Sequence, residues 1–307
     1  MTDAVTAEVP PALEEEAPGV RAVWEALGLP GIVDVHTHFL PPSVLRKVWA
    51  YFDRAGPLTG RRWPITYRTD DADRVARLRA YGVRTFTALA YPHKPEMAAW
   101  LNDWTLDFAA RTPGCLPSAT LYPEPSAEAD VTSALERGAR IFKAHVQVGD
   151  YDPNDPQLRA AWGALADAQV PTVIHAGSGP APGRFTGPEA VARLLATHPR
   201  LPLIVAHLGM PEHAAFLDLA DRYPSVALDT TMTFTDFTEG LAPFPVALRP
   251  RLVELQDRIL LGSDFPNIPH RYVHQLEALV RLELGDGWLR DVLHDNAARR
   301  FGLDATA

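Results

Sequence analysis

Short apolar stretches rich in β-branched residues alternate along the chain with longer stretches in which Leu, Ala and Val recur at helical spacing. The short stretches predict strands at Ile32–Val35, Val83–Leu89, Leu116–Leu121, Ala139–Val146, Thr172–His175, Leu203–His207, Val226–Asp229 and Ile259–Gly262. The longer stretches predict helices at Ala72–Tyr81, Pro95–Arg111, Glu128–Arg137, Gln157–Gln169, Pro188–His198, Glu212–Arg222, Arg249–Gln256 and His270–Leu284. Apolar strands that are each followed by a helix indicate parallel strands buried on both faces. The pattern therefore predicts an α/β protein with the (β/α)8 TIM-barrel fold.

Two connections and the N-terminus depart from this regular pattern. The connections Phe39–Asp70 and Thr230–Leu248 are long, and both follow predicted strands. Because the loops that follow the strands form the catalytic face of such barrels, we expect inserted loops at the C-terminal face. Residues 1–19 include the acidic run Glu14–Glu16, which predicts a short disordered tail. Residues 20–307 are then expected to form a single barrel domain.

The composition excludes several kinds of partner. Acidic residues outnumber basic ones by 38 to 29, which gives a net charge of −9. A chain without basic clusters is poorly suited to nucleic acid or to anionic membranes, so we expect a small-molecule substrate. The single cysteine, Cys115, excludes a disulfide framework and fits the cytoplasm. No stretch approaches the roughly 18 apolar residues of a membrane span.

Titratable side chains stand repeatedly at the ends of the predicted strands. His36 and His38 follow the first strand two residues apart, so both should point into the mouth of the barrel. His175 ends the fifth strand, His207 ends the sixth, and Asp264 follows the eighth. Polar groups at the ends of apolar strands are costly unless they bind something. Together these residues predict a metal site.

Further residues stand close to these strand ends. Lys143 and His145 share one face of the fourth strand and are expected to contact the substrate or groups behind the ligands, and Asn267 should also be able to reach the substrate. Asp34 is expected on the inward face below His36, as an acceptor behind the ligands. The aromatic residues Trp49 and Trp63 of the first long connection either wall the pocket or pack the insertion onto the barrel.

These strand-end residues, with several short motifs, resemble the amidohydrolase superfamily over Gly31–Leu303. The chain is similar in particular to the branch that contains amidohydrolase-related hydrolases and amino-carboxymuconate-semialdehyde decarboxylase. The matching motifs are His36–Pro41, Ala206–Gly209, Gly262–Pro266 and Asn296–Phe301.

The resemblance implies one divalent metal ion, most often zinc, bound by His36, His38, His175 and Asp264, with His207 beside a metal-activated water. Imidazole and carboxylate ligands suit zinc. Asp264 would accept a proton from the water and return it to the leaving group, while His207 would polarise the substrate or orient the nucleophile. In some branches of the superfamily a carbamylated lysine on the fourth strand bridges two metals. We favour a single metal over a pair bridged by carbamylated Lys143.

Two enzymatic functions stay open at this stage. The first is a metal-dependent hydrolase acting on an amide, ester or lactone bond of a small molecule that can carry a carboxylate. The alternative is a non-oxidative decarboxylase of an aromatic or unsaturated carboxylic acid, which would bind the substrate carboxylate with the same ligands. A catalytically silent barrel is disfavoured because all five candidate ligands are present. A homodimer is expected only because dimers are the commonest soluble assembly.

Overall fold

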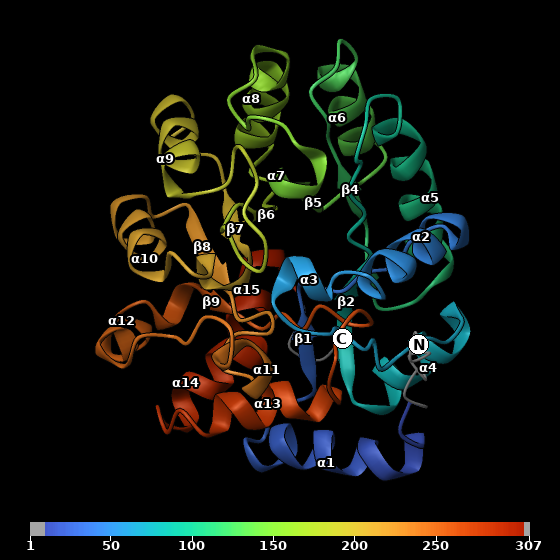
Figure 1. Cartoon of the computed structure of the whole chain (residues 1–307), viewed down its shortest axis with the longest axis vertical. Helices are drawn as coiled ribbons and strands as arrows, with labels where there is room; N and C mark the ends of the chain where they lie inside the picture. The colour runs from blue at the N-terminus through green and yellow to red at the C-terminus, as the bar shows by residue number, and fades with distance from the viewer. Residues whose placement is uncertain (1–9, 304–307) are drawn as a thin grey trace.

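Parallel strands surrounded by helices make up the structure, a computed structural model that describes residues 10–303 (Figure 1). The strands are β1 (Ile32–Asp34), β2 (Val83–Thr87), β3 (Cys115–Leu116), β4 (Ser118–Thr120), β5 (Ile141–His145), β6 (Thr172–His175), β7 (Leu203–Val205), β8 (Val226–Asp229) and β9 (Ile259–Leu260). They lie close to the predicted strands, although several end one or two residues earlier, as β7 does at Val205.

Eight of the helices follow the barrel strands and cover them. They are α4 (Asp71–Ala80), α5 (Ala98–Arg111), α6 (Ala127–Glu136), α8 (Arg159–Ala168), α9 (Pro188–Thr197), α10 (His213–Arg222), α12 (Arg249–Glu254) and α13 (Tyr272–Val280). These helices confirm the predicted ones to within a few residues at each end. The other helices are α1 (Leu13–Ala26), α2 (Pro42–Phe52), α3 (Gly56–Thr59), α7 (Val146–Gly149), α11 (Asp236–Glu239), α14 (Asp286–Arg290) and α15 (Asn296–Phe301).

The strands close into a TIM barrel through two joints. Pairing runs through β1-β2-β3 and through β4-β5-β6-β7-β8-β9, and every pair is parallel. At the first joint β3 and β4 are two parts of one barrel strand, separated by Pro117, which has no N–H to donate. At the second joint the N–H of Val35 donates to the carbonyl of Leu261 at 2.9 Å. The predicted (β/α)8 barrel is thus confirmed.

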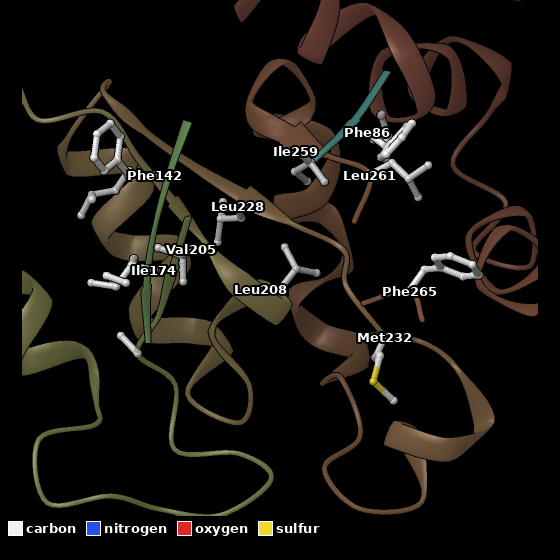
Figure 2. Packing of buried hydrophobic residues seen from close by; sticks show 14 of the residues in the cluster. Phe86, Phe142, Ile174, Val205, Leu208, Leu228, Met232, Ile259, Leu261 and Phe265 are labelled. Carbon is white, nitrogen blue, oxygen red and sulfur yellow. The ribbon is translucent and has the colours of Figure 1, made fainter. Parts of the chain in front are cut away.

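Alternate strand residues pack on the two sides of the barrel wall. Along β5, Ile141 belongs to the cluster that fills the barrel. Phe142 belongs instead to the larger cluster between the strands and the helices, part of which Figure 2 shows. The inner cluster includes Ala297 and Phe301 of α15, which packs against the interior. Lys143 follows Ile141 by two residues, so the alternation directs it to the interior near the mouth.

The N-terminal segment differs from its prediction. Residues 13–19, expected in a disordered tail over 1–19, form the first half of α1, while residues 1–9 lie outside the described part of the chain. Helix α1 lies along the outside of α13 (Figure 1). Within its acidic run, Glu14 and Glu15 are exposed to solvent, whereas Glu16 is only 2% exposed. The run therefore belongs to a docked helix. No helix within residues 10–303 has the length and apolar character needed to cross a membrane.

Candidate metal centre

The strand ends bring the predicted site residues together at the C-terminal mouth. His36 and His38 follow β1, Lys143 and His145 lie in β5, His175 ends β6, and His207 and Asp264 follow β7 and β9. His207 and Asp264 have left-handed backbones, with φ of +56° and +70°. Such conformations are uncommon for residues other than glycine and concentrate at functional sites.

The tightest group comprises His36, His38 and Asp264. One donor atom from each lies within 4.8 Å of the others. Nε2 of His38 is 2.8 Å from Oδ1 of Asp264, and Nε2 of His36 is 3.7 Å from the same oxygen. Ligand atoms about 2.1 Å from one metal ion stand roughly 3–3.5 Å apart, so this spacing fits a shared divalent ion.

The second nitrogen of each histidine is held by an acceptor. Nδ1 of His36 is 2.8 Å from Oδ2 of Asp229, and Nδ1 of His38 is 2.7 Å from the carbonyl oxygen of Leu89. Because these oxygens are acceptors, each Nδ1 carries the hydrogen and each Nε2 keeps its lone pair for a ligand. Burial, followed by the charge of Lys143, lowers the pKa of His36 to about 3, so its imidazole is neutral at neutral pH.

Asp264 completes the group as an anion. Burial alone would raise the pKa of its carboxyl group, but the contact with His38, followed by the neighbouring His36 and His207, holds that pKa well below its usual range. An ionised carboxylate beside two imidazole nitrogens that present lone pairs is a suitable donor set for a divalent cation.

The other predicted residues surround this group. The Nζ atom of Lys143 donates to Nε2 of His36 at 2.9 Å, and burial lowers the pKa of Lys143 to about 8. The ring of His145 stacks on that of His175, with centroids 4.1 Å apart. Nε2 of His175 donates to the carbonyl of Gly179 at 3.0 Å, which leaves Nδ1 as its bare nitrogen. His175 lies outside the three-residue group, so its role as a ligand stays a prediction.

His207 faces the site with one free nitrogen. Its Nδ1 donates to the carbonyl oxygen of Thr231 at 2.9 Å, and its backbone N–H donates to Oδ1 of Asp229 at 2.9 Å. Its ring lies 4.7 Å from that of His175 and 5.5 Å from that of His36. Burial lowers the pKa of His207, so its Nε2 is a proton acceptor at neutral pH.

Two residues of the site were not predicted from the sequence. Asp229 was recognised only as the last residue of a strand, yet it is fully buried and orients both His36 and His207. Its position at a strand end beside the other ligands was the signal that could have identified it. Tyr91 follows β2, and its ring lies 5.5 Å from that of His38 and 4.8 Å from that of His145. Burial raises the pKa of Tyr91, which keeps the phenol protonated as a donor.

Asp34 is not on the inward face where it was expected. Val33 and Val35 belong to the inner cluster, and Asp34 instead accepts a hydrogen bond from the Tyr272 hydroxyl at 2.9 Å. It also accepts from Ser263 Oγ at 2.5 Å and from the backbone N–H of His36 at 3.1 Å. The expectation that it acts as an acceptor behind the ligands agrees with these bonds. Burial raises its pKa to about 7.

Asn267 connects the site to the first long insertion. Its side-chain oxygen accepts from Nε1 of Trp49 at 3.2 Å, and its backbone oxygen accepts from Nε1 of Trp63 at 2.8 Å. The N–H of Thr66 also donates to the carbonyl of Ile268 at 2.9 Å. The tryptophans therefore pack the insertion onto the loop that follows Asp264. A contact between Asn267 and substrate stays a prediction.

The fold and this group of residues define a class of protein: a barrel enzyme with a metal centre at the C-terminal mouth. The chain belongs to the amidohydrolase family, whose sequence model matches residues 33–303. No protein of curated function matches the sequence significantly.

Several solved structures share the fold. An uncharacterized TIM-barrel protein from Bordetella bronchiseptica superposes with a TM-score of 0.70 at 18% identity, over 90% of this chain and 100% of that one. 2,6-Dihydroxybenzoate decarboxylase in complex with 2,6-dihydroxybenzoate gives 0.62 at 20% identity, over 90% and 100% of the two chains. 5-Carboxyvanillate decarboxylase from Novosphingobium aromaticivorans, with manganese and a nitrobenzoic acid, gives 0.64 at 15%, over 98% and 100%.

Proposed function

We propose that this protein is a metal-dependent, non-oxidative decarboxylase of an aromatic or unsaturated carboxylic acid. The observation that carries the proposal is the charge of the buried site. Asp229 and Asp264 are anions, the neighbouring His36 and His207 are neutral at neutral pH, and Lys143 is mostly protonated below its pKa of about 8. A divalent ion bound at Asp264, beside the Lys143 ammonium, would make this buried site favourable for an anionic group such as a substrate carboxylate.

Aromatic rings beside the three-residue group favour a flat substrate. The rings of Tyr91, His145, His175 and His207 lie in succession, with neighbouring centroids 4.1–4.8 Å apart from Tyr91 through His145 and His175 to His207. Planar rings of this kind favour stacking with an aromatic or conjugated acid. Two of the solved structures that share the fold are decarboxylases with aromatic acids bound.

Decarboxylation replaces a carbon–carboxylate bond with a carbon–hydrogen bond. Carbon dioxide leaves without the bonding electron pair, which stays on the substrate carbon and takes up a proton. The bound ion would supply Lewis-acid stabilisation of negative charge on the substrate. Lys143 and the Tyr91 phenol are donors for substrate oxygen atoms. Asp264 or Nε2 of His207 would take up a proton from water or from a substrate hydroxyl and deliver it to the carbon, and would thereby return to its unprotonated form.

For the metal we propose a single divalent ion held by His36, His38 and Asp264, with His175 as a fourth ligand through Nδ1. Zinc suits this mixture of imidazole and carboxylate, while manganese is bound in one related fold. Elemental analysis of the purified protein distinguishes these ions. A cytoplasmic location, a homodimer and the absence of nucleic-acid partners stay predictions.

The proposal is tested by following carbon dioxide release from a panel of hydroxylated benzoic acids and conjugated dienoic acids with the metal-loaded protein. We expect carbon dioxide and the decarboxylated product in equal amounts, and no turnover by His38→Ala. If the loaded protein instead hydrolyses amides, esters or lactones and releases no carbon dioxide from any acid, the decarboxylase proposal is wrong.

A hydrolase is the second candidate, and one observation favours it. Asp264, itself a predicted ligand, and the bare Nε2 of the nearby His207 are two proton acceptors. Hydrolysis of an amide, ester or lactone needs such acceptors to activate water. The same panel experiment, extended to these bonds, decides between the two reactions.

A further inference from the structure

Glu16 places a carboxylate in a buried position outside the metal site. It lies on α1 and is 2% exposed. Its side chain accepts hydrogen bonds from the Tyr67 hydroxyl at 2.7 and 2.9 Å, from the Tyr81 hydroxyl at 2.6 Å and from the N–H of Val273 at 3.3 Å. A buried carboxylate is costly unless it is well hydrogen-bonded, and here three neutral donors meet that need.

The donors come from three separate parts of the chain. Tyr67 belongs to the first long insertion, Tyr81 directly follows α4, and Val273 lies in α13. The three segments are 51, 65 and 257 residues away from Glu16 along the sequence. Glu16 therefore joins α1 to the insertion and to the helix that follows the Asp264 loop.

From Glu16 a continuous series of buried hydrogen bonds leads to the metal centre. The Tyr67 hydroxyl accepts from the backbone N–H of Tyr272 at 2.7 Å, and the Tyr272 hydroxyl donates to Asp34. The Tyr272 ring also stacks on Tyr81, with centroids 5.3 Å apart. Two bonds that involve Glu16 or its partner Tyr67 thus fix the N-terminal turn of α13, and with it the Tyr272 hydroxyl.

Asp34 connects Tyr272 to the segments that carry two of the predicted ligands, His36 and Asp264. It accepts from both the N–H and the hydroxyl of Ser263, the residue before Asp264, and from the N–H of His36. Ser263 Oγ in turn accepts from the N–H of Phe265 at 3.1 Å. The turn that holds Asp264 at φ +70° is therefore fixed from both sides. A left-handed residue persists only where its surroundings over-determine it.

We infer that Glu16 is a positioning residue for the metal centre, and that α1 holds Asp264 in place through Tyr67, Tyr272, Asp34 and Ser263. This inference rests on the metal site of the proposed function. It assigns α1 a role in metal binding although none of its residues contributes to the three-residue group at the mouth.

The inference is tested by titrating metal-free protein with Co2+, whose absorption bands report both affinity and ligand geometry. Glu16→Gln keeps the shape of the side chain but replaces one acceptor with a donor. We expect it to weaken Co2+ affinity by about threefold or more, and Tyr272→Phe, which removes the donor to Asp34, to weaken it about tenfold. Both variants should also shift the bands. Glu15→Gln makes the same charge change at an exposed position of the same helix and should match the wild type.

The double variant separates positioning from simple loss of stability. If Glu16 acts through Tyr272, Glu16→Gln combined with Tyr272→Phe should bind Co2+ about as weakly as Tyr272→Phe alone. Co2+ affinity and bands for Glu16→Gln equal to those of Glu15→Gln would overturn the inference, whatever the melting temperatures. Should Glu16→Gln not fold, Tyr272→Phe decides alone, and wild-type affinity and bands would overturn it. Wild-type protein that binds no Co2+ would instead overturn the metal site, and this inference with it.

Discussion

Replacing Asp229 with asparagine should weaken metal binding at the site about 10–100-fold while leaving the fold intact. Oδ1 of Asp229 accepts from two backbone N–H groups, those of His207 and Thr231, at 2.9 and 3.0 Å. Backbone N–H groups can only donate, so the side-chain amide oxygen of the variant must take the position of Oδ1. The amide NH2 then faces Nδ1 of His36, where Asp229 now accepts at 2.8 Å.

The consequence follows from the tautomer of His36. With a donor opposite Nδ1, that nitrogen must present its lone pair, and the ring hydrogen moves to Nε2. Nε2 is the nitrogen that faces Asp264 and Lys143. A protonated nitrogen cannot bind a metal. Loss of such an orienting partner typically weakens metal binding about 10–100-fold, which is about 1.4–2.8 kcal/mol.

The assay is competition with a chelator of known affinity, using Zn2+ or Mn2+ and metal-free protein. Asp167→Asn provides the control, because Asp167 is 77% exposed on helix α8. We expect Asp229→Asn to bind at least tenfold more weakly than Asp167→Asn, with a circular dichroism spectrum like that of the wild type. Equal affinity in the two variants would refute the tautomer reasoning.

Three other predictions concern the surroundings of the site. Asn267→Ala removes the hydrogen-bond acceptor for Trp49 and should lower the free energy of unfolding by about 1 kcal/mol. It should also speed proteolysis within residues 39–70, and an unchanged cleavage rate would contradict the packing of the insertion onto the Asn267 loop. Phe142→Ala empties a fully buried position outside the barrel wall and should lower the free energy of unfolding by about 3–5 kcal/mol without changing metal affinity. A folded variant that binds metal more weakly would contradict the view that packing outside the barrel wall is independent of the metal site. Burial raises the pKa of the Cys115 thiol to about 12, so the native thiol stays protonated at pH 8 and should not react with a disulfide reagent. Unfolding should return the thiol pKa to about 8.5 and make it reactive; rapid labelling of the native protein would contradict the burial of Cys115.

The hydrophobic pattern predicted the barrel because each strand and helix is buried in a regular way. Ile141 and Phe142 are both apolar and lie on opposite sides of the wall, which produces the continuous apolar runs typical of parallel strands. The strand-end residues were predicted for the same reason, since parallel strands must deliver their ends to one face.

The residues that could not be predicted depend on long-range partners or on local departures from regular geometry. Glu16 was assigned to a disordered tail because its neighbours are acidic, and its donors Tyr67 and Tyr81 lie far along the sequence. Asp34 was placed inward by assuming that it shares a strand face with His36, but β1 ends at Asp34 and His36 lies beyond the regular strand, so the alternation does not extend to it. The partner of a carboxylate such as Asp229 is set by tertiary contacts that no periodicity reports.

The central claim is that one metal ion at His36, His38 and Asp264 supports decarboxylation. The most direct measurement follows carbon dioxide release from the acid panel by metal-free protein as a divalent metal is added. We predict that activity rises in proportion to bound metal and saturates at one ion per chain, and that Asp264→Ala neither binds the ion tightly nor turns over. Carbon dioxide release that is independent of metal, or stoichiometric metal binding retained by Asp264→Ala, would contradict the claim.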